Sequence, residues 1–287
     1  MADQDSPNHA SGTFEIAGKQ VHRLGFGAMR LTGQGIWGPP ADRDECVAVV
    51  RRAVELGVEL IDTADSYGPY VSEEIIREAL HPYPDNVVIA TKAGLVRTGP
   101  DQWLPVGRPE YLRQEVEMSL RRLGVDRIEL FQLHRIDAKV SVEDQIGELV
   151  KLQDEGKIAD IGLSEVDVDQ LDEVRKLATV VTVQNRFNLG DRKSEDVLDR
   201  CTAEGIGFIP WAPVNAGSLT RKGGPVDDIA EKTGATYSQV ALAWLLARAQ
   251  NIVPIPGTSS VKHLEENMGA ASVHLTPEQV TELSDAA

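Results

Sequence analysis

The chain has 287 residues, of which 41% are apolar and 26% are charged, and these fractions are typical of a globular protein with a large core. Its formal net charge of −16 argues against nucleic acid or an anionic membrane surface as a partner. No apolar run approaches the length of about 18 residues that a transmembrane helix needs, so no membrane span is expected.

The N-terminal segment, residues 1–12, is polar and lacks the apolar stretch of a signal peptide. We therefore expect a disordered tail over 1–12 and a single domain over 13–287. The two cysteines, Cys46 and Cys201, lie far apart in segments with helical patterns. Free thiols in a cytoplasmic protein fit this usage best, and Cys201 has no neighbouring base in sequence that would make it reactive.

An expected β-hairpin opens the domain, and short apolar runs then alternate with longer amphipathic segments. The hairpin pairs residues 13–16 with 20–23 around a turn at Gly18. The expected strands that follow are 24–27, 58–62, 87–92, 128–134, 158–164, 180–185, 207–211 and 252–256.

The amphipathic segments between these runs predict helices at 43–56, 72–80, 109–123, 142–155, 168–178, 194–204 and 238–248. Four of them are followed by a glycine, as helix C-termini favour: Gly57, Gly124, Gly156 and Gly205. The order indicates an α/β fold, a (β/α)8 TIM barrel with an N-terminal β-hairpin. A doubly wound open sheet remains the alternative architecture.

Several expected strands end on a polar residue that points inward. Alternate residues of a barrel strand face its interior, and active sites of such barrels lie at the C-terminal ends of the strands. The last inward residues with a hydrogen-bonding group are Asp62, Lys92, His134, Ser164, Gln184 and Trp211.

Lys92 lies inside an apolar strand, where a lone ammonium is costly to bury. It therefore needs a carboxylate, and Asp62 at the end of the preceding strand is the natural partner. A buried ion pair of this kind can have a purely structural role, in which it fixes the register of the two strands. Tyr67, one loop beyond Asp62, and His134, on the next strand, favour chemistry instead.

These four residues suit the reduction of a carbonyl group. A free tyrosine has a pKa of about 10, and we expect the Lys92 cation to lower that value for Tyr67. The phenol can then give its proton to a carbonyl oxygen that gains charge, while His134 orients the same oxygen. The site supplies no hydride, so a cofactor must bring it.

Two other kinds of site, a Gly-rich dinucleotide-binding loop and a metal site, are not supported by the sequence. Residues 33–38, Gly-Gln-Gly-Ile-Trp-Gly, match a dinucleotide-binding pattern, but Pro39 and Pro40 follow at once and leave no helix start to hold a pyrophosphate. We therefore expect a long loop there. The six histidines show no metal-binding spacing, so no metal site is expected.

The chain resembles the aldo-keto reductase superfamily over nearly its whole length, from residue 24 to Asn267. The motifs are Ile-Asp-Thr-Ala-Asp-Ser-Tyr-Gly at 61–68, Ala-Thr-Lys at 90–92, Leu-His at 133–134, Ile-Gly-Leu-Ser at 161–164, Val-Gln-Asn at 183–185 and Ile-Pro-Gly-Thr-Ser at 255–259. The resemblance implies that Asp62, Tyr67, Lys92 and His134 are a catalytic tetrad with Tyr67 as general acid.

The resemblance also implies NADPH, bound extended across the barrel mouth. Ser164 and Gln184 would then bind the carboxamide, Trp211 would stack on the nicotinamide, and the loop after the last strand would hold the 2′-phosphate. The cofactor-binding residues implied in this way are Gly27, Ala28, Asp62, Ser164, Gln184, Trp211, Gly257, Thr258, Ser259, His263, Glu266 and Asn267.

Three positions depart from the family pattern. Glu165 stands where many members have asparagine, Gly257 where several have lysine, and His263 where they have arginine. A phosphate normally binds Arg or Lys, and the nearby cations here are Lys262, Arg221 and Lys222. We expect NADPH, with NADH also possible.

Residues 35–40, 67–70 and 255–264 resemble the bacterial branch that includes pyridoxal reductases, also called pyridoxine 4-dehydrogenases. This makes pyridoxal a possible substrate, and a small-molecule carbonyl compound is the expected partner of a chain expected to be monomeric. Trp37 and Trp103 either line the substrate site with Tyr67 and His134 or anchor their loops.

Two other functions remain open. Lys92 could form a Schiff base, as in some barrel aldolases, although a partner carboxylate that keeps it protonated argues against this. The chain could instead be a regulatory subunit that binds NADP(H) with little turnover. No chemistry is assigned to Asp65 within the 61–68 motif.

Overall fold

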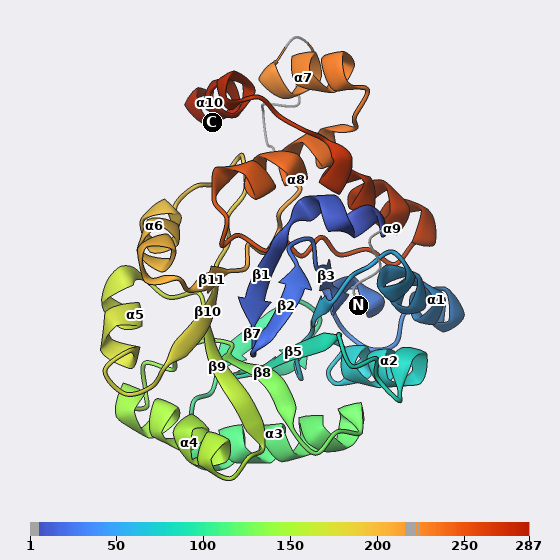
Figure 1. Cartoon of the computed structure of the whole chain (residues 1–287). Helices are drawn as coiled ribbons and strands as arrows, with labels where there is room; N and C mark the ends of the chain where they lie inside the picture. The colour runs from blue at the N-terminus through green and yellow to red at the C-terminus, as the bar shows by residue number, and fades with distance from the viewer. Residues whose placement is uncertain (1–5, 216–221, 223, 287) are drawn as a thin grey trace.

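Within the described residues, 6–215, 222 and 224–286 of this computed structural model, seven parallel strands form one curled sheet in the order β11-β10-β9-β8-β5-β4-β3. Figure 1 shows these strands at the centre of a ring of helices. The strands are β3 (Phe26–Gly27), β4 (Leu60–Asp62), β5 (Val88–Ala93), β8 (Ile128–Leu133), β9 (Ile158–Ser164), β10 (Val180–Gln184) and β11 (Gly207–Phe208).

The expected eighth strand, 252–256, is not a regular strand, yet it closes the barrel. Val253 donates its N–H to the carbonyl of Phe208 in β11 (2.8 Å), and Gly25 beside β3 donates to the carbonyl of Pro254 (2.9 Å). Pro254 and Pro256 have no N–H to give, so a full ladder cannot form. The expected α/β barrel with an N-terminal hairpin is confirmed, with an incomplete ladder at this seam.

The helices follow the strands in the expected alternation and lie outside the sheet (Figure 1). They are α1 (Arg43–Glu55), α2 (Val71–Leu80), α3 (Pro109–Leu123), α4 (Val142–Asp154), α5 (Val168–Val174), α6 (Glu195–Glu204), α7 (Pro225–Thr233), α8 (Tyr237–Arg248), α9 (Val261–Met268) and α10 (Pro277–Asp285). Gly124 and Gly205 end α3 and α6 with φ of 73° and 69°, a left-handed conformation that glycine adopts without strain.

Several elements were not expected from the sequence. They are the helices α7 and α10, the 3-10 helices η2 (Ala28–Leu31) and η4 (Gly269–Ser272), and an antiparallel hairpin of β6 (Leu95–Gly99) and β7 (Gln102–Pro105). The β6–β7 hairpin follows β5 directly and thus lies at the C-terminal end of the barrel strands.

A second hairpin, β1 (Thr13–Ile16) and β2 (Lys19–His22), lies across the middle of the ring in Figure 1. Ile16 and Val21 pack in one apolar cluster with the inward residues Leu60, Val88 and Leu130. Leu60 and Val88 are the first residues of β4 and β5, so the hairpin covers the N-terminal end of the barrel and leaves the C-terminal end for function.

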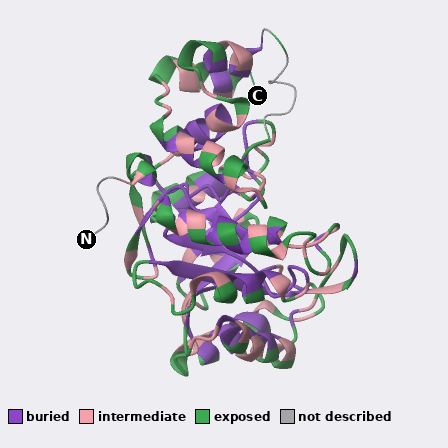
Figure 2. Ribbon diagram, turned by 90° about the vertical axis from the view of Figure 1, so that its right-hand side faces the viewer, coloured by how far each residue is buried: buried purple, intermediate pink, exposed green. Residues whose placement is uncertain are grey.

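Burial follows the alternation expected of barrel strands. Figure 2 shows buried residues concentrated in the central strands, while the helices are exposed along their outer faces. The outward residues Ile61 and Ile89 belong to a different cluster, in which they pack against α1 and α2 through residues such as Val50 and Ile75. The inward and outward assignments made from parity therefore agree with the packing.

The disordered tail expected over 1–12 is wrong for residues 6–12, while residues 1–5 lie outside the described part. Residues Pro7–Ser11 form the 3-10 helix η1. Asn8 is fully buried and donates its side-chain amide to the carbonyls of Leu24 (2.7 Å) and Gly57 (2.9 Å). Polarity misled the sequence interpretation, because a polar side chain that finds backbone partners can be buried.

No helix of the described residues is long and apolar enough to cross a membrane. Cys46 and Cys201 are both free and buried. Burial raises the pKa of the Cys201 thiol to about 12, which agrees with a structural role for this residue.

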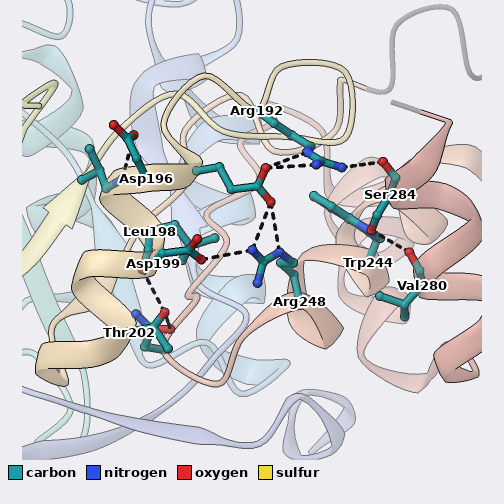
Figure 3. A network of polar contacts seen from close by, with 12 residues as sticks. Arg192, Asp196, Leu198, Asp199, Thr202, Trp244, Arg248, Val280 and Ser284 are labelled. Atoms are coloured by element: carbon teal, nitrogen blue, oxygen red, sulfur yellow. Dashed lines mark hydrogen bonds and ion pairs between the residues drawn. The ribbon is translucent and has the colours of Figure 1, made fainter. Parts of the chain in front are cut away.

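A polar network attaches the C-terminal helix to the barrel (Figure 3). Arg192 donates to the carbonyl of Ser284 in α10, and the Trp244 indole of α8 donates to the Ser284 hydroxyl at 3.0 Å. The Glu195 carboxylate at the start of α6 accepts from both Arg192 (3.0 Å) and Arg248 (3.0 Å). The Glu195 carboxylate therefore joins α6 to α8 through Arg248, and it holds Arg192, which in turn binds α10.

Glu195→Gln should lower the free energy of unfolding by about 1 kcal/mol, because it removes the charge from hydrogen bonds to two arginines. Asp199→Asn is the matched control, since Asp199 accepts a single bond from Arg248 and its side chain is 63% exposed. Urea denaturation of both variants measures the difference. Equal stability losses would show that Glu195 has no special part in the network.

Candidate active site

A buried ion pair lies at the C-terminal ends of β4 and β5. The Lys92 ammonium is fully buried and donates to Asp62 Oδ1 at 2.6 Å, as expected from the sequence. It also donates to the carbonyl oxygen of Thr63 at 2.8 Å. Burial alone would lower the pKa of Lys92, but the neighbouring Asp62 carboxylate outweighs it and the net pKa is raised, so this lysine is a cation at neutral pH.

The second oxygen of Asp62 is held by two amides. Gln132 at the end of β8 donates its side-chain nitrogen to Asp62 Oδ2 at 3.0 Å, and Gln184 at the end of β10 does so at 2.8 Å. Both glutamines are buried. The carboxylate is thus compensated by one cation and two hydrogen-bond donors, which is what burial of such a pair requires.

Tyr67 lies in the loop after β4, with its hydroxyl 3.3 Å from Lys92 Nζ. The loop is fixed by backbone bonds from Asp65 N–H to Lys92 O (3.1 Å) and from Tyr70 N–H to Asp65 O (2.7 Å). Burial raises the pKa of the phenol, and the Lys92 charge offsets only part of this rise. The expected net lowering is therefore wrong, and Tyr67 holds its proton at neutral pH.

His134 follows β8 and faces Tyr67, with ring centroids 5.9 Å apart. Burial lowers its pKa well below the usual value, and the charges of Lys92 and Arg135 add to the effect. The imidazole is therefore neutral at pH 7. Ser66 Oγ lies 3.3 Å from His134 Nδ1; when the hydroxyl donates there, Nε2 carries the hydrogen and can donate in turn.

Of the two tryptophans considered in the sequence, Trp103 lies beside Tyr67 and His134. The Trp103 ring, on β7, makes edge contacts with both Tyr67 and His134, at centroid distances of 6.4 Å in each case. Trp37 is 36% exposed and lies beside the Arg97 guanidinium at 5.8 Å. Trp103 therefore contacts the Tyr67 ring directly, whereas Trp37 lies beside Arg97 and is exposed to solvent.

The strand ends of β9 to β11 carry the residues expected near a nicotinamide. The half-buried Trp211 donates its indole N–H to Glu165 Oε1 at 2.6 Å, and the same oxygen accepts from the Arg186 backbone N–H at 2.7 Å. Ser164 is buried and accepts from Arg135 at 3.1 Å. Glu165, a departure from the family pattern, thus orients Trp211.

Gly27 and Gly257 meet where β3 approaches the loop after the eighth segment. A Cβ on Gly27 would lie 2.6 Å from the carbonyl oxygen of Ile255, and one on Gly257 would lie 2.5 Å from that of Gly27. No larger residue fits at either place, so these two glycines have a packing reason besides any cofactor. Ala28 is buried, and its carbonyl accepts from the hydroxyl of Ser72.

The remaining residues expected to bind the cofactor extend from the loop before α9 to the last turn of that helix. Thr258 is buried, Ser259 and His263 are exposed, and Glu266 and Asn267 are half-buried. The first N–H of α9, on Val261, donates to the Glu45 carboxylate of α1 at 3.0 Å. Arg221, named above as a possible cation, lies outside the described residues.

Three site residues were missed from the sequence. Gln132 shares the inward parity of His134, two residues later on the same expected strand, and this parity could have placed it beside Asp62. Arg135 borders His134 and donates to Ser164, and its position directly after the histidine was the only available signal. Arg97 donates its hydrogen bonds to backbone carbonyls and lies over an aromatic ring, and no sequence pattern marks such a role.

The Gly-rich segment 33–38 forms a turn and not a cofactor loop. Gly33 N–H donates to the carbonyl of Gly38 at 3.0 Å, and Trp37 pairs with Gly68 in an isolated bridge. No helix begins there, since α1 starts at Arg43. Among the described residues no group of three or more His, Cys, Asp or Glu is arranged to hold a metal ion.

The arrangement as a whole can donate one proton to a bound oxygen. A protonated phenol and a neutral imidazole lie side by side, and a lysine cation stands 3.3 Å behind the phenol oxygen to stabilise the phenolate that remains. Trp103 borders the two rings, so a ligand in this space meets an aromatic wall.

Comparison with known proteins finds similar sequences over nearly the whole chain. The model of the Aldo/keto reductase family matches residues 23–287. An uncharacterized oxidoreductase of Schizosaccharomyces pombe is 51% identical over 275 residues, which cover 96% of this chain and 90% of that protein. The pyridoxine 4-dehydrogenase of Escherichia coli is 43% identical over 280 residues, which cover 96% of this chain and 98% of that protein.

A similar solved structure is a thermostable aldo-keto reductase in complex with the inhibitor epalrestat. It superposes with a TM-score of 0.84 at 28% sequence identity, covering 96% of this chain and 99% of that one.

Asp65 is a buried carboxyl group that keeps its proton in the folded protein. It is 1% exposed, accepts a hydrogen bond from the Tyr111 hydroxyl at 3.3 Å, and its Oδ1 has no hydrogen-bond partner among the described residues. Burial, together with the charges of Glu73 and Glu115, raises its pKa well above the usual value. The folded protein therefore keeps a proton that the unfolded chain releases near pH ~4.

Because of this difference, Asp65 makes the free energy of unfolding fall as the pH rises above about 4. Asp65→Asn has no such proton, so its stability should fall less steeply between about pH 4 and pH 7 than that of the wild type. Denaturation at several pH values measures both slopes. Parallel curves would mean that Asp65 is ionised in the folded protein.

Proposed function

This chain is an oxidoreductase that belongs to the aldo/keto reductase family, and we propose that it reduces an aldehyde or ketone to an alcohol with NADPH as the hydride donor. The observation that carries the proposal is the buried contact of Lys92 with both Asp62 Oδ1 (2.6 Å) and the Tyr67 hydroxyl (3.3 Å). In this arrangement the Tyr67 phenol can donate its proton, and the Lys92 cation beside it stabilises the phenolate that remains.

The proton transfer follows from the protonation states. A carbonyl oxygen bound between Tyr67 and His134 gains negative charge as its carbon is reduced. The His134 N–H stabilises that charge, and the Tyr67 O–H bond breaks to give the oxygen its proton. The phenolate left behind lies beside the Lys92 ammonium, which Asp62 keeps charged, and it is reprotonated from solvent.

The cofactor supplies a hydride to the carbonyl carbon. The residues at the strand ends fit its nicotinamide: Trp211 offers a half-buried ring held by Glu165, and Gln184 has its side-chain nitrogen committed to Asp62, which leaves its oxygen to accept from a carboxamide. Thr258, Ser259 and the exposed Lys262 suit the 2′-phosphate. Because this 2′-phosphate site has few arginine or lysine side chains, we propose that NADH is also accepted as a hydride donor.

Pyridoxal is the substrate that we propose to test first. The relative from Escherichia coli that is 43% identical is a pyridoxine 4-dehydrogenase. Trp103, in edge contact with Tyr67 and His134, gives the site an aromatic wall on which a flat ring aldehyde can pack. Two free, buried cysteines are consistent with a reducing compartment such as the cytoplasm, and we expect a monomer.

The Schiff-base alternative is disfavoured by the state of Lys92. A nucleophilic lysine must be neutral, whereas the Asp62 carboxylate raises the pKa of Lys92. A regulatory subunit with little turnover is disfavoured because the donor, the cation and the buried carboxylate are all in place.

Tyr67→Phe should lower kcat by about a hundredfold or more, because the general acid is lost, while NADPH affinity stays the same. The assay is NADPH oxidation across a panel of aldehydes and ketones that includes pyridoxal. Tyr237→Phe, the same change at an exposed tyrosine, is the matched control. Near-normal turnover by Tyr67→Phe would remove Tyr67 from the role of acid.

Cofactor preference gives a separate test. We expect the wild type to have a kcat/KM for NADPH about tenfold above that for NADH, and His263→Arg to widen the ratio by adding a fixed cation for the 2′-phosphate. Steady-state kinetics with both cofactors measure the two ratios. A higher kcat/KM for NADH in the wild type would overturn the assignment of NADPH.

A further inference from the structure

We propose that Arg97 is a positioning residue for the reaction: it holds Trp103 and the Tyr67 loop in the geometry that binds the carbonyl substrate, without touching the substrate itself. This inference rests on the proposed function. Arg97 lies on β6, the first strand of the hairpin that follows β5, and is half-buried.

All five N–H groups of the Arg97 guanidinium donate to backbone carbonyl oxygens. Nε bonds Gln102 (2.8 Å) in its own hairpin. One terminal nitrogen bonds Ile36 (2.7 Å) and Ser66 (2.9 Å), and the other bonds Gly35 (2.8 Å) and Gly99 (3.3 Å). The five carbonyls come from three separate loops, so one side chain joins segments that are distant in sequence.

The guanidinium also lies over the ring of Trp103 and, at a longer distance, over that of Trp37. Its carbon lies 3.5 Å from the ring centroid of Trp103 and 5.8 Å from that of Trp37. The first distance is a close cation–π contact, which is strongest when the cation is shielded from water. Arg97 thereby covers one face of Trp103 and leaves the rest of the ring to contact Tyr67 and His134.

Two of these contacts lead directly to the reacting groups. Ser66, whose carbonyl Arg97 binds, precedes Tyr67 in the chain, and its hydroxyl lies 3.3 Å from His134 Nδ1. Trp103 lies 6.4 Å from the rings of both Tyr67 and His134. Arg97 therefore fixes the proton donor, the imidazole and the aromatic wall relative to one another.

The chemistry of this position requires arginine. A lysine has three donors on one nitrogen and cannot reach five carbonyls spread around a plane, nor stack flat on an indole. Because every N–H of Arg97 is already committed, the residue has no donor left for a substrate anion. Its effect on the reaction must pass through Trp103 and the loop before Tyr67.

The test uses Arg97→Lys and Arg97→Met, with Arg108→Met as the matched control at a side chain that is 72% exposed just beyond the hairpin. Both Arg97 variants should raise KM for the carbonyl substrate by about tenfold or more, because the binding wall is misplaced. NADPH affinity by calorimetry should stay near wild type, whereas the thermal midpoint should fall, because five backbone carbonyls lose hydrogen bonds to a charged donor. Arg108→Met should match the wild type throughout.

A double-mutant cycle shows whether Arg97 acts through the tryptophan. In a Trp103→Leu background, Arg97→Met should raise KM by much less than it does in the wild type, since the ring that it positions is absent. Full additivity of the two changes would overturn the inference. Unchanged KM in both Arg97 variants, or a KM change accompanied by equal loss of NADPH affinity, would overturn it as well.

Amide hydrogen exchange separates this inference from the proposed function. Faster exchange of residues 33–38 and 66–68 in Arg97→Lys supports the positioning role even if no carbonyl compound is turned over by the wild type, an outcome that would refute the reductase proposal alone. Exchange identical to the wild type in these segments would refute the positioning role, whatever the activity.

Discussion

The buried ion pair of Lys92 and Asp62 is the interaction on which the rest of the site depends. A fully buried ammonium is tolerated only if a carboxylate meets it, and that carboxylate in turn needs its remaining oxygen satisfied. Gln132 and Gln184 meet that need from two other strands. The pair therefore sets the register of four strand ends at once, and the same cation stands ready beside the Tyr67 hydroxyl.

Burial sets the protonation states around this pair, and it does so in opposite directions for neighbouring groups. It raises the pKa of the phenol and lowers that of the imidazole, so Tyr67 keeps its proton and His134 stays neutral. Lys92 remains charged, because the Asp62 carboxylate outweighs the cost of burial. A hydrogen-bond donor, a proton donor and a fixed cation thus coexist within one small volume at neutral pH.

Much of this could be predicted from the sequence, because period-two alternation and strand-end polarity are local signals. They placed Asp62 and Lys92 at the ends of neighbouring strands and identified the barrel. Contacts that depend on backbone atoms left no such signal. Arg97 donates to backbone carbonyls, and the buried Asn8 side chain donates to two more. The sequence of residue types does not reveal such partners, so the roles of both residues were missed. The sign of the Tyr67 pKa shift depended on the depth of burial, which charge proximity alone did not reveal.

The proline-containing segment 252–256 has a consequence for how the chain is made. It is the segment that pairs with Gly25 and Gly27 beside and within β3, more than two hundred residues earlier in the chain. Until it has been synthesised, β3 presents an unpaired sheet edge, and such an edge invites pairing with other chains. In the nascent protein this edge of β3 therefore stays open until the segment 252–256 has emerged to cover it.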